Sequence, residues 1–268
     1  MGIGYIFGGS SAVLPFFLIA LVINLIGYYT SDKLALRMAH ARELPIHQAP
    51  EIHEEVKRLS NSIGIPMPKI YTSDDPQPNA FATGRNPEHS VICLTRGLLE
   101  TLSPEETKGV LAHELGHIKN RDILVATLAA VIAGAIASIA QIGFFFGSSE
   151  DDDGFAGNIL LLILAPISAS LIQLAISRSR EYGADHIGAT TTGKPLALAS
   201  ALVKIHNKAQ QLPLHNTNPA LSSLYIQNPF KGHGVIEWFS THPATEKRVE
   251  KLEKIANELK SKHSLSYA

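Results

Sequence analysis

The sequence predicts a mainly α-helical membrane protein, with three transmembrane helices and a helical domain outside the lipid that includes a small β-hairpin. Three observations support this fold class. Residues 1–31 and 123–177 contain no Lys or Arg, and these gaps hold long apolar runs. The charged segments between the gaps show the apolar periodicity of amphipathic helices. One of these segments also contains two short runs separated by turn residues, the pattern of a hairpin.

The apolar runs cover residues 11–29, 123–147 and 158–177. Each approaches or exceeds the roughly 20 residues that a helix needs to cross a hydrocarbon core. A helix that is apolar all round can also lie in the core of a large soluble protein, but a chain of 268 residues is too small to bury three of them. We therefore expect an N-terminal transmembrane segment at 1–31, a first domain part at 32–122, a transmembrane hairpin at 123–177 and a second domain part at 178–268.

Basic residues follow the first and third apolar runs and precede the second. They predict how the three helices are oriented in the membrane. They are Lys33, Arg37, Arg42, Lys119, Arg121, Arg178 and Arg180. The positive-inside tendency places these ends in the cytoplasm, whereas the acidic turn at 150–153 has no basic residue and is expected outside. The chain is thus predicted to be a multi-pass protein of the cytoplasmic (inner) membrane, with both domain parts in the cytoplasm.

Composition narrows the range of partners. The formal net charge of −1 gives no reason to expect nucleic acid. Cys93 is the single cysteine, so an internal disulfide is excluded, and its apolar surroundings predict a buried thiol. The apolar runs make the lipid bilayer an expected partner, and nothing in the sequence specifies an oligomeric state.

The two domain parts contain recognisable elements. In the first, Pro50–Ile63 is predicted to be a helix that Gly64 ends, and a strand is expected within residues 66–73. A hairpin of residues 79–84 and 89–95 and a short helix at 96–102 follow. In the second part we predict a helix at 195–210, a long loop at 212–240 and an amphipathic helix at 243–260.

Residues 113–117 read H-E-x-x-H within a predicted helix at 104–122. Ser103 and Glu106 form a capping-box pattern at its start. Histidines four apart on a helix share one face, so His113 and His117 can both bind one zinc ion, with Glu114 beside them as a general base. Because the chain has twelve histidines, the motif alone remains a hypothesis. The alternative is an exposed helix with two solvated histidines.

A catalytic zinc site needs a third protein ligand. The segment at 180–186 offers Glu181, Asp185 and His186. Glu181 and Asp185 are four apart and share a helical face, so one can bind the metal while the other orients a ligating histidine. The residues by themselves leave the choice open.

Four segments together resemble the HtpX-type membrane metalloproteases, relatives of the CAAX prenyl proteases within the gluzincins. These segments are His113–His117 followed by Asn120 and Asp122, residues 181–185, residues 79–84, and residues 242–248. They occur in the family's order and span nearly the whole chain. The resemblance implies a helical gluzincin-like catalytic domain.

The resemblance also implies roles for individual residues. It makes Glu181 the third zinc ligand, with Asp185 and Asn120 supporting the ligands. His242 would stabilise the oxyanion, with Arg248 holding the local loop. The segment that would bind a peptide substrate as an edge strand, by backbone pairing, consists of Asn79, Ala80, Phe81, Ala82, Thr83 and Gly84.

The function expected from these observations is a membrane-embedded endopeptidase with one zinc ion per chain and a cytoplasm-facing site. Its substrates would be polypeptides. The resemblance points to misfolded or damaged membrane proteins, with prenylated peptides a weaker option. An intramembrane-cleaving protease is disfavoured because Glu105, Lys108 and Lys119 flank the motif. The other alternative is a non-catalytic metal-binding scaffold, against which the presence of Glu114 argues.

The chain departs from the family at its start. Family members usually have a further membrane span before the one at residues 11–29. Only ten residues precede this run here, too few for a crossing. We therefore expect either a shortened chain or a naturally three-spanning member.

Overall fold

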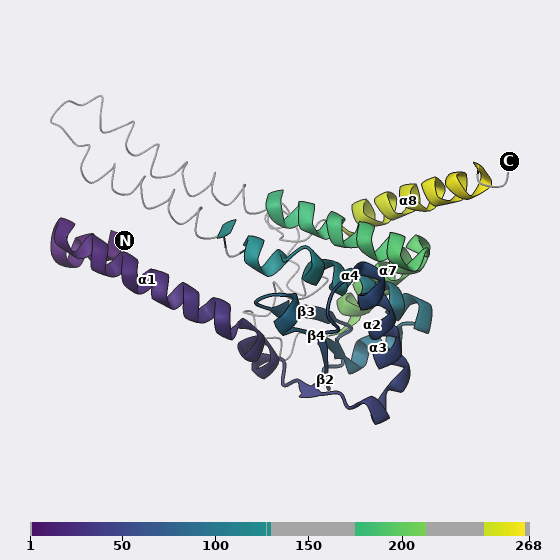
Figure 1. The fold of residues 1–268 in the computed structure, drawn as a ribbon, viewed down its shortest axis with the longest axis horizontal. Helices are drawn as coiled ribbons and strands as arrows, with labels where there is room; N and C mark the ends of the chain where they lie inside the picture. The colour runs from purple at the N-terminus through teal and green to yellow at the C-terminus, as the bar shows by residue number, and fades with distance from the viewer. Residues whose placement is uncertain (1, 127, 130–174, 213–243, 266–268) are drawn as a thin grey trace. The chain divides into compact units, whose positions relative to one another are not determined.

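The computed structural model describes residues 2–126, 128–129, 175–212 and 244–265 (Figure 1). The chain divides into two compact units. One unit contains Met1–Thr30 and Leu124–Ile176, and the other contains Ser31–Ile123 and Ser177–Ala268. Helix α1 (Gly2–Met38) begins in the first unit and ends in the second. All candidate site residues that the structure describes belong to the second unit.

The described helices cover the predicted membrane spans only in part. The span at residues 11–29 falls within α1, where Leu14, Leu18 and Ile26 are exposed. The spans at 123–147 and 158–177 fall almost entirely outside the described residues. Among the helices that are described, none has the combination of length and apolar character that a membrane crossing requires. The three transmembrane helices therefore stay predictions.

The second unit contains a four-stranded sheet in the order β1-β2-β4-β3. β1 (Arg42–Glu43) pairs antiparallel with β2 (Lys69–Ser73), and β2 pairs parallel with β4 (Ser90–Thr95). β3 (Ala80–Gly84) pairs antiparallel with β4, with Phe81 opposite Cys93. The predicted strand at 66–73 and the predicted hairpin are thus confirmed. Within the described part of the chain, β3 is one of the two terminal strands of the sheet.

A glycine makes the hairpin connection possible. Gly84 has φ = +131°, and a Cβ at this position would lie 2.2 Å from the carbonyl oxygen of His89. Only a residue without a Cβ fits such a close backbone approach. The short 3₁₀ turn η2 (Pro87–His89) follows, where the Asn86 side chain accepts a hydrogen bond from the His89 amide at 2.9 Å. The chain then enters β4.

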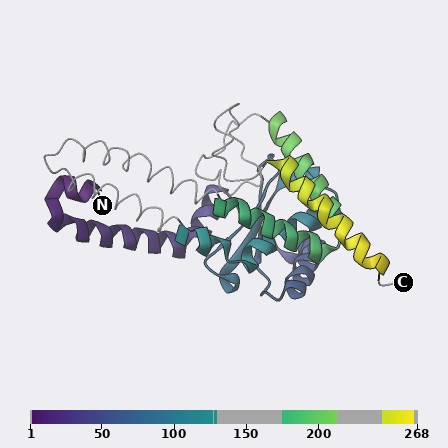
Figure 2. The ribbon, with the colours of Figure 1, turned by 90° about the horizontal axis from the view of Figure 1, so that it is seen from above.

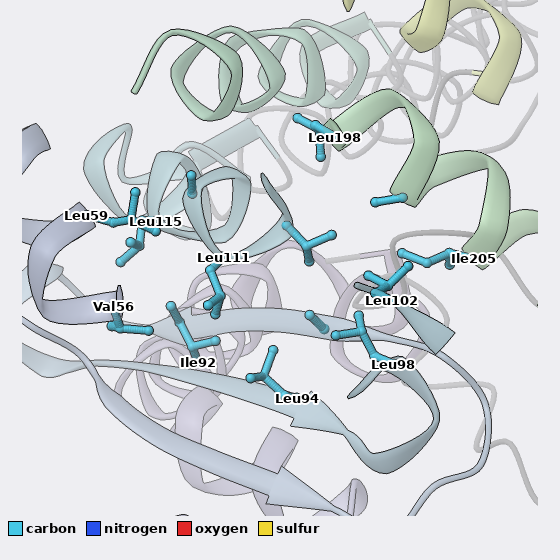
Figure 3. Packing of buried hydrophobic residues seen from close by; sticks show 14 of the residues in the cluster. Val56, Leu59, Ile92, Leu94, Leu98, Leu102, Leu111, Leu115, Leu198 and Ile205 are labelled. Atoms are coloured by element: carbon cyan, nitrogen blue, oxygen red, sulfur yellow. The ribbon is translucent and has the colours of Figure 1, made fainter. Parts of the chain in front are cut away.

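One face of the sheet carries the main hydrophobic core of the second unit (Figure 3). Helices α2 (Pro50–Ile63), α3 (Arg96–Thr101), α4 (Pro104–Lys119) and α7 (Pro195–Gln211) contribute to it. Alternate residues of β4, Ile92 and Leu94, point into this core and are fully buried. On the opposite face, Cys93 and Phe81 pack against Ala35 near the end of α1. The core therefore fixes α4 against the sheet.

The start of α4 is the capping box that the sequence predicts. The Ser103 hydroxyl accepts a hydrogen bond from the Glu106 amide, and the Glu106 carboxylate accepts one from the Ser103 amide at 2.8 Å. Glu106 also accepts hydrogen bonds from Ser200 at 2.6 Å and from Lys204 at 2.8 Å, both on α7. The cap therefore joins α4 to α7 as well as starting the helix.

The end of α4 differs from the prediction. The helix was expected to continue to Asp122, but it ends at Lys119 with Asn120 as its C-cap. Arg121 then adopts the left-handed conformation with φ = +54°, and helical structure resumes at Asp122. A left-handed residue cannot continue a right-handed helix, so the chain changes direction here.

The remaining described elements are helical. Residues 175–192 form a helix, and α7 and α8 (Thr245–Leu265) follow, with α8 alongside α7 in both views (Figures 1 and 2). The predicted helices at 50–63, 96–102 and 195–210 are confirmed to within a residue. α8 begins two residues later and ends five residues later than the predicted 243–260. The predicted long loop lies outside the described residues apart from its first residue.

Candidate metal centre

His113 and His117 lie one turn apart on the buried face of α4. Their Nε2 atoms are 3.1 Å from each other. His113 is almost completely buried, whereas the His117 side chain keeps 19% of its surface exposed. The helical spacing has therefore brought two imidazole nitrogens to one point at the edge of the core.

Glu181 approaches the same point from helical residues 175–192. Its Oε2 atom lies 3.7 Å from His113 Nε2, and its Oε1 atom lies 3.6 Å from His117 Nε2. Small residues allow this close approach, because a Cβ at Gly116 would stand 3.1 Å from Ala184 Cα. A Cβ at Gly188 would likewise stand 3.1 Å from the His113 amide nitrogen. The two helices thus meet nearly backbone to backbone.

The structure separates the three candidates for the third ligand. Glu181 faces the Nε2 side of both rings, and its carboxylate and the two histidines offer ligand atoms within 4.8 Å of one another. Asp185 lies on the other side of His113, with Oδ1 3.0 Å from Nδ1. His186, the next residue, is exposed. Of these three residues, Glu181 is the one that could complete a metal site.

Each histidine has a carboxylate at its Nδ1 atom. Asp185 contacts Nδ1 of His113, and Asp122 contacts Nδ1 of His117 with its Oδ2 atom at 2.5 Å. This arrangement assigns the Nδ1–H tautomer to both rings, so that each Nδ1 donates and each Nε2 directs its lone pair toward Glu181. Two ring nitrogens and a carboxylate that face one another need positive charge between them, from a bound proton or from a metal ion.

Arg248 on α8 balances part of the negative charge. Its guanidinium is fully buried and donates two hydrogen bonds to Asp185, at 2.8 and 2.6 Å. Another of its nitrogens lies 3.2 Å from Glu181 Oε2. Burial opposes ionisation of Asp185, but the charge of Arg248 together with hydrogen bonds from His113 and Arg248 outweighs this effect and holds the pKa of Asp185 below its usual value. The structure places Arg248 against two carboxylates. Its expected role in holding the local loop stays a prediction.

The electrostatics of the site favour a cation between the rings. Burial lowers the pKa of His117, but its hydrogen bond to Asp122 and the charges of Glu181 and Glu114 more than offset this and raise that pKa to about 9. Zinc bonds to nitrogen and oxygen at about 2.0–2.2 Å, so ligand atoms at tetrahedral angles stand about 3.4 Å apart. The two Nε2 atoms are 3.1 Å apart here, and they lie 3.7 and 3.6 Å from Oε2 and Oε1 of Glu181, respectively. The donor set and its spacing therefore fit zinc.

The other predicted site residues occupy different places. Glu114 is buried on α4, and its charge acts on both His117 and Arg248. Asn120 caps α4, and its amide nitrogen would lie 3.4 Å from a Cβ at Gly183, so it packs on the Glu181 helix. Asn79 precedes β3, which contacts α4 and contains Ala80, Phe81, Ala82, Thr83 and Gly84. His242 lies outside the described residues.

Asp122 is absent from the predicted set of supporting residues. As the fifth residue after His117, it would not share a face with that histidine on a continuous helix. The break at Arg121 returns its side chain to the ring. The one indication of this contact in the sequence is that Asp122 belongs to the family motif that follows His117.

The model of Peptidase family M48 matches residues 46–256 of this chain, which include all the ligand candidates. The chain belongs to Peptidase family M48. It is therefore a metallopeptidase, and the His113, His117 and Glu181 cluster is a group that could hold the metal.

Relatives agree with this family over nearly the whole chain. A protein named Protease HtpX homolog from Aquifex aeolicus is 51% identical over 97% of this chain and 89% of its own length. A second with that name, from Pyrococcus furiosus, is 51% identical over 97% of this chain and 92% of its own. Among solved structures, S. mikatae Ste24p matches with a TM-score of 0.58 and 21% identity over 93% of this chain. The chain spans 60% of the length of that Ste24p, and the match shows similarity of fold.

Proposed function

We propose that this metallopeptidase is a zinc endopeptidase that binds one zinc ion through His113, His117 and Glu181. The observation that carries the proposal is the meeting of three donor groups, from two separate helices, at separations that suit tetrahedral coordination. Zinc at such a site supplies Lewis-acid polarisation of a carbonyl group and a lowered pKa for water. Three protein ligands leave one coordination position for the reaction.

The chain's own residues supply the proton transfers. Glu114 follows the first ligand in sequence and lies close enough to His117 and Arg248 for its charge to act on both. In the proposed mechanism its carboxylate takes a proton from the attacking water and gives it to the leaving amine. General acid–base catalysis of this kind is worth about 10²–10⁴-fold in rate. His242 is proposed, from the resemblance, to donate a hydrogen bond to the oxyanion.

β3 is proposed to bind the substrate backbone. It is one of the two terminal strands of the described sheet, and it contacts helix α4, which carries His113 and His117. An extended peptide can add to such an edge through main-chain hydrogen bonds, with little demand on its sequence. This mode suits an enzyme that cleaves many different polypeptides.

We further propose that the enzyme acts at the cytoplasmic face of a membrane, on misfolded or damaged membrane proteins. Support comes from the long apolar runs that lack Lys and Arg, and from the basic residues at their shared side. Only residues 118–122 separate His117 from the second run. A site so near the predicted lipid boundary would reach unfolded segments of membrane proteins.

The test is zinc-dependent proteolysis by the purified chain in mild detergent. We expect the protein to cleave casein and a misfolded membrane protein, to stop when 1,10-phenanthroline is added, and to recover with added zinc. Glu114→Gln is the matched control, because it keeps the three ligands and removes the general base. It should bind zinc normally, and its rate of cleavage should fall by at least about 10²-fold. Cleavage by Glu114→Gln at the wild-type rate would disprove this mechanism.

A further inference from the structure

The helix break at Arg121 separates His117 from the carboxylate that contacts it. Arg121 is one of two described non-glycine residues with positive φ, and its amide hydrogen bonds to the Ile118 carbonyl at 3.1 Å. Arginine has no particular preference for the left-handed conformation, so this conformation is imposed by its surroundings. Asp122 follows immediately, and it is only 7% exposed.

Asp122 is held in place at two points. Its carboxylate contacts His117 Nδ1, and its main-chain carbonyl accepts a hydrogen bond of 2.6 Å from Arg180. Arg180 is the residue before Glu181. The helix that brings the third ligand therefore also holds the turn that brings the partner of the second ligand.

A buried carboxylate requires a partner that offsets its lost hydration. The partner of Asp122 is the imidazole of His117, whose Nδ1–H donates a short hydrogen bond to the carboxylate. The same relationship joins Asp185 to His113 at 3.0 Å, but Asp185 is also neutralised by Arg248. The ionisable group that contacts the Asp122 carboxylate is His117.

We propose that Asp122 is the positioning residue of His117, and that the left-handed turn at Arg121 exists to aim it. This inference rests on the proposed zinc site. Asp122 holds the ring in the Nδ1–H tautomer, fixes its rotation about the Cβ–Cγ bond and makes Nε2 a stronger electron donor to a metal. Partners of this kind typically change metal affinity by about 10–100-fold. Asp122 acts through His117 and is not itself a ligand.

The experiment measures zinc affinity of the full chain in detergent by competition with a chromophoric chelator. Asp122→Asn should bind zinc about 10–100-fold more weakly than wild type. Arg121→Val should show a similar loss, because a β-branched residue strongly disfavours positive φ, whereas Arg121→Gly should keep wild-type affinity. Unfolding of the metal-free protein is measured in parallel, so that a general loss of folding is recognised. If Asp122→Asn does not fold, the two Arg121 variants still decide the question.

A spectroscopic measurement separates positioning from a purely structural role. Cobalt(II) bound in place of zinc reports ligand geometry through its visible absorption bands, which should shift in Asp122→Asn and remain unchanged in Arg121→Gly. Wild-type zinc affinity in Asp122→Asn, with unchanged cobalt bands, would overturn the positioning role while leaving the zinc site intact. A wild-type chain that binds no zinc would instead overturn the proposed function, and with it this inference.

Discussion

Gly116 lies directly against Ala184, so that a Cβ at position 116 would stand 3.1 Å from the Ala184 Cα and 3.3 Å from its carbonyl oxygen. Gly116 is within the H-E-x-x-H motif, and Ala184 is three residues after Glu181. The absence of one side chain therefore sets how closely the two ligand-bearing helices approach. The separations of 3.6 and 3.7 Å between Glu181 and the histidines depend on that approach.

Replacing Gly116 should weaken metal binding. Gly116→Val adds a branched side chain against backbone atoms that cannot rotate away, so the Glu181 helix must move outward. We expect about a tenfold or greater loss of zinc affinity, the scale seen when the support of a ligand is disturbed. Equilibrium competition with a chelator measures it.

The control for this substitution is Gly27→Val in α1. A Cβ at Gly27 would meet nothing within 4 Å, so zinc affinity should not change. Equal affinity in Gly116→Val and wild type would show that the helix spacing does not control the site.

Arg248→Met should strongly destabilise the metal-free protein. Arg248 is fully buried and binds both Asp185 and Glu181, so its removal leaves two buried carboxylates without their cation. Breaking a buried pair in this way costs about 3–5 kcal/mol. The free energy of unfolding in urea is the quantity to measure.

Arg58→Met provides the comparison. Arg58 pairs with Glu55 on α2, but its side chain is 51% exposed, and pairs of this kind contribute about 0–1 kcal/mol. If Arg248→Met lowered the free energy of unfolding no more than Arg58→Met does, Arg248 would not anchor α8.

Glu106 should make stability depend on acid pH. Burial opposes its ionisation, but hydrogen bonds from Lys204, Ser200 and Ser103 outweigh this and lower its pKa from 4.5 to about 2. The unfolded chain therefore binds a proton as pH falls below 4.5, while the folded chain resists until about pH 2. The stability that ionised Glu106 contributes is complete above pH 4.5 and is lost as pH falls through this window.

The difference in unfolding free energy between wild type and Glu106→Gln isolates this effect. It should be about 1.5–3 kcal/mol at neutral pH, the range for hydrogen bonds to a charged group, and should shrink steadily below pH 4.5. Glu105→Gln, on the same helical turn but with an exposed side chain paired to Lys194, should show little change at any pH. A difference for Glu106→Gln that stays constant from pH 7 to 3 would contradict the assignment.

Gly84→Ala should disrupt the strand that we propose binds substrate. Its φ of +131° is unfavourable for alanine, and the new Cβ would lie 2.2 Å from the His89 carbonyl oxygen. Gly193→Ala has φ = +66° and open space around it, so it bears only the conformational penalty of about 1–2 kcal/mol. We expect Gly84→Ala to lose more free energy of unfolding than Gly193→Ala and to cleave casein more slowly than wild type. Similar stability in the two variants would argue against the tight hairpin connection.

Much of the local structure could be predicted because its causes are local. The capping box at Ser103 and Glu106, the stop at Gly64 and the hairpin at 79–95 each depend on residues a few positions apart. The face of α4 that carries the two candidate ligands could be predicted for the same reason, since His113 and His117 are four residues apart on one helix. The predicted helix end at Asp122 was wrong, because the left-handed position is occupied by Arg121, which is neither glycine nor asparagine.

The sequence by itself determined the pair of histidines with their neighbouring glutamate, and the elements that carry them. Only the tertiary structure decided that Glu181 faces the Nε2 atoms while Asp185 lies behind His113, that Asp122 serves His117, and that Arg248 binds two carboxylates. The physical reason is distance along the chain. Contacts between α4, helical residues 175–192 and α8 depend on how closely their backbones pack, and residues such as Gly116 and Gly188 fix that spacing without any periodic pattern that would predict it.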